Sequence, residues 1–124
     1  MQIIGFITSQ VIEKLNLNLP PDTPIFLGET NELHIKTRHP YEYEKYFPHI
    51  TEIIKFPDYI GKNPKDNSLL FVKLYQIQGE YIRVAVKITG SGKCFAKTLH
   101  LLSTCNAERY IDKGTLIPLD IPSE

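Results

Sequence analysis

The segment from Glu32 to Pro40, Glu-Leu-His-Ile-Lys-Thr-Arg-His-Pro, places two imidazoles, a lysine and an arginine within nine residues. An imidazole titrates near neutral pH, so one histidine can accept a proton while a second donates one. Lysine and arginine are cations that hold phosphate groups. Together these are the residue types of a site that cleaves a phosphodiester bond. His34 and His39 are therefore candidate catalytic residues and Arg38 a candidate phosphate contact, although exposed histidines beside a proline are also common on protein surfaces.

The composition is that of one globular domain, here residues 1–124, with 42% apolar and 23% charged residues. Basic and acidic residues balance at 14 each, so no overall charge steers the chain to nucleic acid. Residues 69–104, however, contain five basic residues and one acidic residue, a local charge of +4. This stretch predicts a basic surface, and Lys87 and Lys97 within it are candidate RNA contacts.

Neither the cysteines nor the histidines show the spacing of a metal site. Cys94 and Cys105 have no partner motif, so we expect a reduced chain without a disulfide. No carboxylate or cysteine stands at ligand spacing beside His34 or His39, so we expect neither a metal nor another cofactor. The chain has no apolar run of the roughly 20 residues that span a bilayer and no signal peptide, so we expect a cytoplasmic protein without a membrane partner.

Helical patterns come first in the chain and extended patterns afterwards. Helices are expected after Thr8, from residue 31, on either side of Pro48 within residues 41–56, and at residues 106–112. Residues 33–38 fit a helix or a strand. Strands are expected at residues 24–28, 69–76, 80–89, 93–103 and 115–119, with a solvent loop at residues 62–68. This order predicts an α+β fold in which helices cover one face of an antiparallel sheet and leave the other face polar.

The hairpin after residue 76 decides which side chains meet on the polar face. With a three-residue loop at residues 77–79, Tyr75 pairs with Tyr81 and Lys73 pairs with Arg83. Two like charges in opposite positions destabilise a sheet unless an anion lies between them, so this register suits a phosphate backbone. A two-residue loop shifts the register by one and removes the argument.

Two residues of the strands are further candidates for chemistry, each with a structural alternative. Lys73 lies in an apolar strand, where it serves either catalysis or the solubility of the sheet. The Thr98 hydroxyl could donate to a phosphate oxygen, but threonine is also a favoured strand residue.

The order of these motifs resembles the phage-associated PBECR domains, which belong to the superfamily that groups barnase, EndoU, colicin and RelE-type ribonucleases. The similarity covers residues 4–118. The motifs that carry it are Ile4-Gly5, Leu33-His34-Ile35, Arg38-His39-Pro40, Pro57-Asp58-Tyr59-Ile60, Phe71-Val72-Lys73 and a later strand with Thr98.

The resemblance implies a metal-independent ribonuclease with short N-terminal helices and a strongly bent antiparallel sheet of about four strands, on which RNA lies. Four residues match the catalytic positions of the family: His34, His39, Lys73 and Thr98. The family often has an aromatic residue where this chain continues with Leu99-His100, so His100 is a rival to Thr98. The candidate RNA contacts are Arg38, Tyr75, Arg83, Lys87 and Lys97.

These observations predict an endoribonuclease that cuts tRNA or mRNA. A histidine would deprotonate the ribose 2′-hydroxyl, a second group would protonate the 5′-oxygen, and Lys73 with Arg38 would stabilise the charge on the phosphate. A toxin or phage-conflict role with an immunity or antitoxin protein as partner is expected. Two alternatives are a non-catalytic RNA- or protein-binding module of phage origin and an unrelated α+β phosphate-transferring enzyme that needs a divalent ion.

Overall fold

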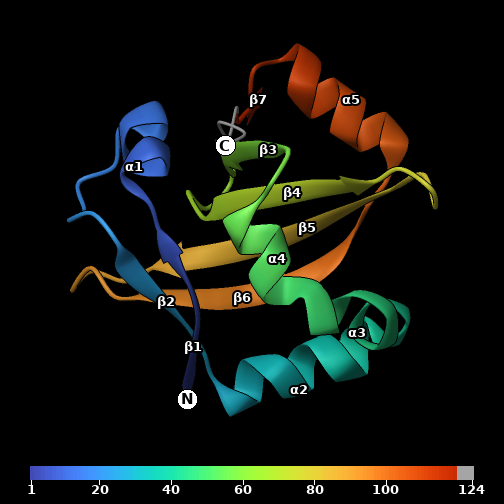
Figure 1. Cartoon of the computed structure of the whole chain (residues 1–124), viewed down its shortest axis with the longest axis horizontal. Coiled ribbons are helices and arrows are strands. Elements are labelled where there is room, and N and C mark those ends of the chain that lie inside the picture. The colour runs from blue at the N-terminus through green and yellow to red at the C-terminus, as the bar shows by residue number, and fades with distance from the viewer. Residues whose placement is uncertain (120–124) are drawn as a thin grey trace.

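A single mixed sheet of seven strands organises the computed structural model, which describes residues 1–119. The strands are β1 (Gln2–Ile7), β2 (Thr23–Leu27), β3 (Tyr59–Lys62), β4 (Leu69–Tyr75), β5 (Glu80–Ile88), β6 (Cys94–Leu102) and β7 (Leu116–Pro118). They lie in the order β1-β2-β6-β5-β4-β3-β7 (Figure 1). Neighbouring strands run antiparallel except β2 and β6, which run parallel.

The helices connect and cover these strands. They are α1 (Ser9–Leu15), α2 (Glu29–Arg38), α3 (Pro40–Tyr46), the 3-10 helix η1 (Phe47–His49), α4 (Ile50–Lys55) and α5 (Thr104–Asp112). The break at Pro48 is confirmed, and the ambiguous residues 33–38 are helical. The Thr8 hydroxyl caps α1 by accepting from the Val11 amide at 3.3 Å, whereas α2 begins at Glu29 and is not capped by Thr30 as predicted.

The α+β class is confirmed, but the prediction of about four strands is wrong. The prediction of N-terminal helices followed by an antiparallel sheet is also wrong, because the chain begins with β1, β2 lies between α1 and α2, and β2 pairs parallel with β6. The sequence patterns missed β1, which is short and carries partly exposed apolar residues, and β3, which follows a Pro-Asp turn signal. Gly61 in β3 allows the close approach of the next segment, because a Cβ atom there would lie 2.0 Å from the carbonyl oxygen of Thr115. These additional strands extend the predicted meander at both edges.

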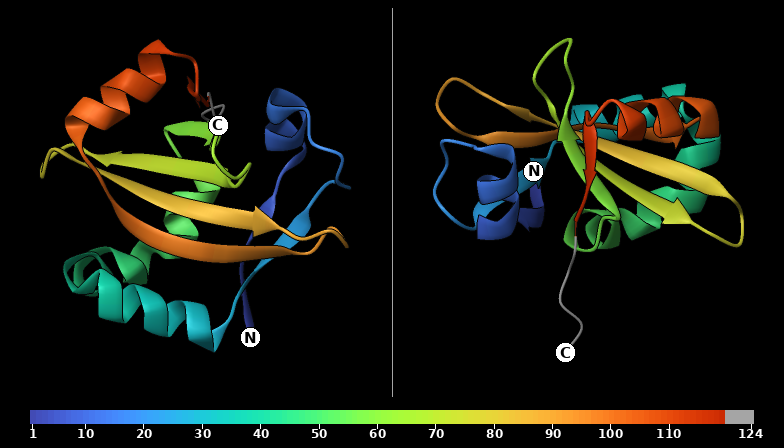
Figure 2. Two further views of the ribbon diagram at one scale, coloured as in Figure 1. Left: turned by 180° about the vertical axis from the view of Figure 1, so that it is seen from behind. Right: turned by 90° about the horizontal axis from the view of Figure 1, so that it is seen from above.

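The central strands have two faces with different coverings. The helix face carries Ile82 and Val84 of β5, which belong to the main core together with residues of α2, α3 and α4. The open face carries Arg83 and Ala85 of the same strand, and α5 packs on part of it through Ala107. The alternation predicted for β5 is confirmed, but the expectation that helices cover only one face is wrong. In the left view of Figure 2 the open face lies between α5 and the α2–α3 pair.

The β4–β5 hairpin has a different register from the predicted one. Tyr75 pairs with Glu80, so the loop has four residues, 76–79, with Gly79 at a φ of 66°. Lys73 therefore pairs with Ile82, and Arg83 pairs with Val72. The predicted opposition of Lys73 and Arg83 is wrong: the register is one residue off, which places the two side chains on opposite faces of the sheet.

A β-bulge in β6 decides which of its side chains lie on the open face. Val86 of β5 pairs with Ala96, while Ala85 pairs with Thr98, so Lys97 is an extra residue in β6. The side chain of Ala96 is buried in the main core, whereas Thr98 and His100 lie on the open face beside Ala85 and Arg83. Simple alternation along β6 would have kept Ala96, Thr98 and His100 on one face.

Candidate active site

The first two histidines meet where α2 ends and α3 begins. His39 lies between the two helices, directly before Pro40, and His34 lies on the exposed surface of α2. The centroids of the two rings are 6.4 Å apart in an edge-to-face arrangement. Arg38, four residues after His34, shares that side of α2 and is exposed. The structure thus brings together the two imidazoles that the sequence singled out.

A third imidazole joins them from β6. The ring of His100 stacks on that of His39, with centroids 5.0 Å apart and an interplanar angle of 21°. The α2–α3 pair packs along β6. There the backbone amide of Leu101 donates to the Glu42 carboxylate at 3.0 Å. The same carboxylate lies 3.9 Å from Nδ1 of His39. Glu42 therefore fixes α3 to the strand and holds His39 over His100.

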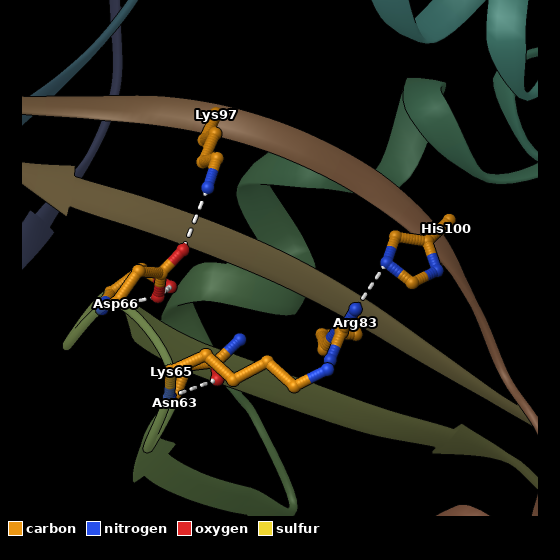
Figure 3. A network of polar contacts seen from close by, with 7 residues as sticks. Asn63, Lys65, Asp66, Arg83, Lys97 and His100 are labelled. Atoms are coloured by element: carbon orange, nitrogen blue, oxygen red, sulfur yellow. Dashed lines mark hydrogen bonds and ion pairs between the residues drawn. The ribbon is translucent and has the colours of Figure 1, made fainter.

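Arg83 contacts the third histidine from the neighbouring strand (Figure 3). Its Nη2 donates to Nε2 of His100 at 2.5 Å, while Nδ1 of His100 donates to the carbonyl oxygen of Leu101 at 3.1 Å. These contacts assign the neutral tautomer with the proton on Nδ1. Burial, and then the charge of Arg83, lower the pKa of His100, so this ring remains neutral at pH 7.

Two buried polar atoms beside this contact have no hydrogen-bond partner within residues 1–119. They are Nε of Arg83 and Oγ1 of Thr98. Thr98 pairs with Ala85, so its hydroxyl lies on the open face next to the paired Arg83 and His100. Leaving a buried donor unpaired costs about 1–3 kcal/mol, so such atoms are expected to bond to water, an ion or a ligand. An arginine N–H and a threonine hydroxyl can both donate to the oxygens of one phosphate.

A loop from the β3–β4 connection reaches across β5 to β6 and borders this site (Figure 3). Asp66 forms an ion pair with Lys97 at 2.7 Å. The carboxylate also accepts from the backbone amide and the hydroxyl of Ser68 at 3.0 and 2.7 Å. Lys97, and then Ser68, hold the pKa of Asp66 well below its usual range. Lys97, a predicted RNA contact, therefore already has an anionic partner in this structure.

Two of the predicted site residues lie away from the histidines, on the helix face. Lys73 Nζ donates to the carbonyl oxygen of Phe56 at 2.9 Å. The Tyr75 hydroxyl donates to Glu52 at 3.0 Å, and burial together with this bond raises the pKa of Tyr75. The structure does not bring Lys73 or Tyr75 to the imidazoles, whereas the exposed Lys87 lies on the open face with Arg83.

Sequence reasoning missed the partners that complete the cluster. His100 appeared only as a rival to Thr98, and the structure places both residues on the open face. The contact of His100 with Arg83 could have been found from strand pairing if the hairpin register and the bulge had been known. Glu42 carried no signal, because a glutamate in an exposed helical pattern is ordinary.

Four further features of residues 1–119 were compared with this cluster. No group of three or more His, Cys, Asp or Glu side chains in this part of the chain is arranged to hold a metal ion. Cys94 is buried and Cys105 exposed, both as free thiols. A groove between β1 and α4, lined mainly by apolar residues, contains no histidine. No helix in the described residues has the length and apolar character to cross a bilayer.

Comparison with known proteins identifies one family. The sequence model of the family described as phage-Barnase-EndoU-ColicinE5/D-RelE like nuclease3 (PBECR3) matches residues 1–113. Comparisons with curated proteins and with solved structures give no match. The match includes every residue of the cluster described above.

Proposed function

This chain belongs to the phage-Barnase-EndoU-ColicinE5/D-RelE like nuclease3 family, and we propose that it is a metal-independent endoribonuclease. One observation carries the proposal. The ring of His34 lies beside that of His39, which stacks on His100, and His100 in turn contacts Arg83. Both Nε of Arg83 and the hydroxyl of Thr98 are buried and unpaired within the described residues. Groups that transfer protons therefore lie beside groups that can hold a phosphate.

In the proposed reaction the ribose 2′-oxygen attacks the adjacent phosphorus. The O2′–P bond forms, the P–O5′ bond breaks, and the products are a 2′,3′-cyclic phosphate and a 5′-hydroxyl. His34 and His39 supply the two proton transfers: one takes the proton of the 2′-hydroxyl and the other gives a proton to the leaving 5′-oxygen. The nucleophile belongs to the RNA, so the reaction requires no metal-bound water, and DNA cannot react.

Arg83 and Thr98 bind the non-bridging oxygens of the phosphate, where negative charge grows in the transition state. His100 stays neutral and accepts from Nη2 of the guanidinium, which leaves Nε without a partner among the described residues. Lys73 was the sequence candidate for this role, but its place on the helix face favours Arg83 instead. Arg38 and Lys87 are exposed and suited to phosphates farther along the RNA.

A role as a toxin or phage-conflict effector, with tRNA or mRNA as its substrate, is part of the same proposal. It is supported by the name of the family, which groups phage nucleases with colicins and RelE. An immunity or antitoxin protein would then be expected to cover the open face, where the histidines and Arg83 lie.

The test is a cleavage assay on end-labelled single-stranded RNA in the presence of EDTA. The wild-type protein should produce fragments with 2′,3′-cyclic phosphate ends and leave the DNA of the same sequence intact. His34→Ala and His39→Ala should each lower the rate by about 10²- to 10⁴-fold, the usual contribution of a general acid or base. His49→Ala is the matched control, since His49 is exposed in η1, outside the cluster.

Cleavage that requires Mg²⁺ or Zn²⁺ would favour the divalent-ion enzyme over this proposal. RNA binding without any cleavage would favour the binding module. Equal rates for the variants at His34, His39 and His49 would remove the imidazole cluster from the mechanism.

A further inference from the structure

The open face carries a second group of side chains, beyond Thr98 toward the start of β6. Phe95 in β6 pairs with Phe26 in β2 across the parallel strands. Their neighbours Cys94 and Ile25 are buried in the main core, so alternation directs both phenylalanine rings to the open face. The rings are half-buried, with centroids 6.1 Å apart and an interplanar angle of 43°. They form one aromatic platform, defined here as Phe26 and Phe95.

Two lysines accompany this aromatic platform. Lys93 Nζ lies 5.0 Å from the ring centroid of Phe26 and 5.6 Å from that of Phe95. Lys87 pairs with Phe95 across β5 and β6 and is exposed on the same face. The platform therefore has positive charges beside it. An apolar pair that only packs two strands together has no need of them.

The bulge at Lys97 places this platform and the proposed phosphate site on the same face of the sheet, with the Asp66–Lys97 ion pair between them along the strand. It reverses the alternation between Phe95 and Thr98, so both side chains lie on the open face. Two residues separate them in the strand, so their Cα atoms lie roughly 10 Å apart, a distance that a short stretch of extended RNA can cover. A strand whose phosphate sits at Arg83 and Thr98 would therefore carry a nearby base over the phenylalanine rings.

We propose that Phe26 and Phe95 form a stacking subsite for an unpaired base of the RNA substrate, with Lys87 and Lys93 contacting the flanking phosphates. The inference rests on the proposed function, because it takes the RNA path from the phosphate site. An exposed lysine binds an aromatic ring more weakly than a nucleic-acid base stacks on one, so a base displaces Lys93 from the rings. The displaced ammonium group then pairs with the RNA backbone.

This subsite selects single-stranded RNA. In a duplex each base is stacked between its neighbours and offers no free ring face, whereas an unpaired base can turn out onto aromatic side chains. Stacking does not involve the hydrogen-bonding edges of the bases. The platform therefore requires unpaired RNA but distinguishes little between base sequences.

The experiment measures binding of a labelled 2′-O-methyl RNA of about ten nucleotides by fluorescence anisotropy. The methyl group blocks the nucleophile, so binding is measured without cleavage. Phe95→Leu keeps apolar volume but removes the aromatic face, and Phe95→Tyr restores it. Phe56→Leu is the matched control, because Phe56 is also exposed beneath a lysine, with Lys55 Nζ 5.4 Å from its centroid, at the end of α4.

Phe95→Leu is expected to weaken binding roughly 5- to 150-fold, the effect of losing one stacked base. Phe95→Tyr and Phe56→Leu should bind as the wild type does, and the same RNA annealed to its complement should bind more weakly. Lys93→Ala should reduce the salt dependence by about one phosphate contact, and as a change at an exposed lysine it tests the subsite without disturbing the core.

Equal affinities for Phe95→Leu and Phe56→Leu, or equal binding of duplex and single strand, would overturn the subsite. Its failure is distinguishable from failure of the proposed function. RNA cleavage that depends on His39, together with binding indifferent to Phe95, would reject the subsite alone. Binding that depends on Phe95, in a protein that cleaves no RNA, would reject the nuclease proposal and leave an RNA-binding surface.

Discussion

Two polar clusters lie on opposite faces of β5 and differ in how completely their atoms are paired. On the helix face, the Glu80 carboxylate accepts from the hydroxyl of Tyr41 at 3.0 and 3.1 Å and from the buried hydroxyl of Tyr46, and it forms an ion pair with Lys45 at 3.5 Å. On the open face, Arg83 donates to His100 but leaves its buried Nε without a partner.

The difference indicates separate roles. Burial, and the bond to Glu80, raise the pKa of Tyr46 to about 12, while the Tyr46 hydroxyl is the main cause that lowers the pKa of Glu80. A network paired in this way stabilises the hairpin against α3. The Arg83 cluster gives up stability by keeping donors free, which is expected where a ligand supplies the missing acceptors. Four changes test this contrast.

The largest expected effect is on catalysis. Arg83→Gln should reduce single-turnover cleavage by about 10²- to 10³-fold, as for the loss of one preorganised group that stabilises transition-state charge. Its melting temperature should change little, because Arg83 makes few satisfied contacts. Arg109→Gln, at an exposed arginine of α5, is the control. A large drop in melting temperature with normal cleavage would show that the open-face cluster is structural.

The opposite outcome is expected for Glu80→Ala. It leaves the buried Tyr46 hydroxyl without its acceptor, so the free energy of unfolding should fall by about 1–3 kcal/mol while the cleavage rate stays unchanged. Urea denaturation measures the first quantity and single-turnover kinetics the second. Lys87→Ala, on the same strand, serves as the stability control. If Glu80→Ala abolished cleavage in the folded protein, the two clusters would not be separate.

Thr98→Val replaces the unpaired hydroxyl by a methyl group of similar size. Removing a buried polar atom without a partner should leave the free energy of unfolding unchanged or raise it by up to about 1 kcal/mol. Cleavage should fall by roughly tenfold, the effect of one lost neutral hydrogen bond of about 1.4 kcal/mol to the phosphate. A clear loss of stability would mean that the hydroxyl has a structural partner.

The smallest effect concerns pH and His100. Because its pKa is lower in the folded state than the ordinary 6.5, the unfolded chain takes up a proton first as the pH falls. The stabilising contribution is complete above about pH 6.5 and is lost as the pH falls toward the folded value. Urea denaturation between about pH 8 and pH 5 should show this decline. His100→Gln should flatten it and His49→Gln should not.

The sequence by itself determined the local elements and the first half of the site. Pro48 divides two helices, and the alternation of Ile82, Val84 and Val86 marks a strand with one core face, because both signals act over a few neighbouring residues. The pair His34 and His39 was visible because both residues lie in one short segment, but their contact depends on the chain leaving the helix at His39.

The additional strands β1 and β3 and the register of the β4–β5 hairpin were harder to predict from the sequence. β1 and β3 acquire their strand character from pairing with other segments, and no strand was predicted for either of them. The hairpin loop holds one residue more than predicted, which is enough to move Lys73 to the helix face. The length of this loop depends on how the backbone turns at Gly79. It cannot be inferred from the alternation of residues in the two strands.

Only the tertiary structure decided how the site is assembled. Packing of α2 and α3 along the edge of β6 brings His39 onto His100, which lies far along the chain, and strand pairing sets Arg83 against that ring. The bulge at Lys97 turns Thr98 and His100 away from the core and onto the face of Phe95. A bulge inserts one residue into a strand, so every later side chain of that strand points to the opposite face from the one that simple alternation predicts. No pattern in the sequence of β6 indicated this bulge.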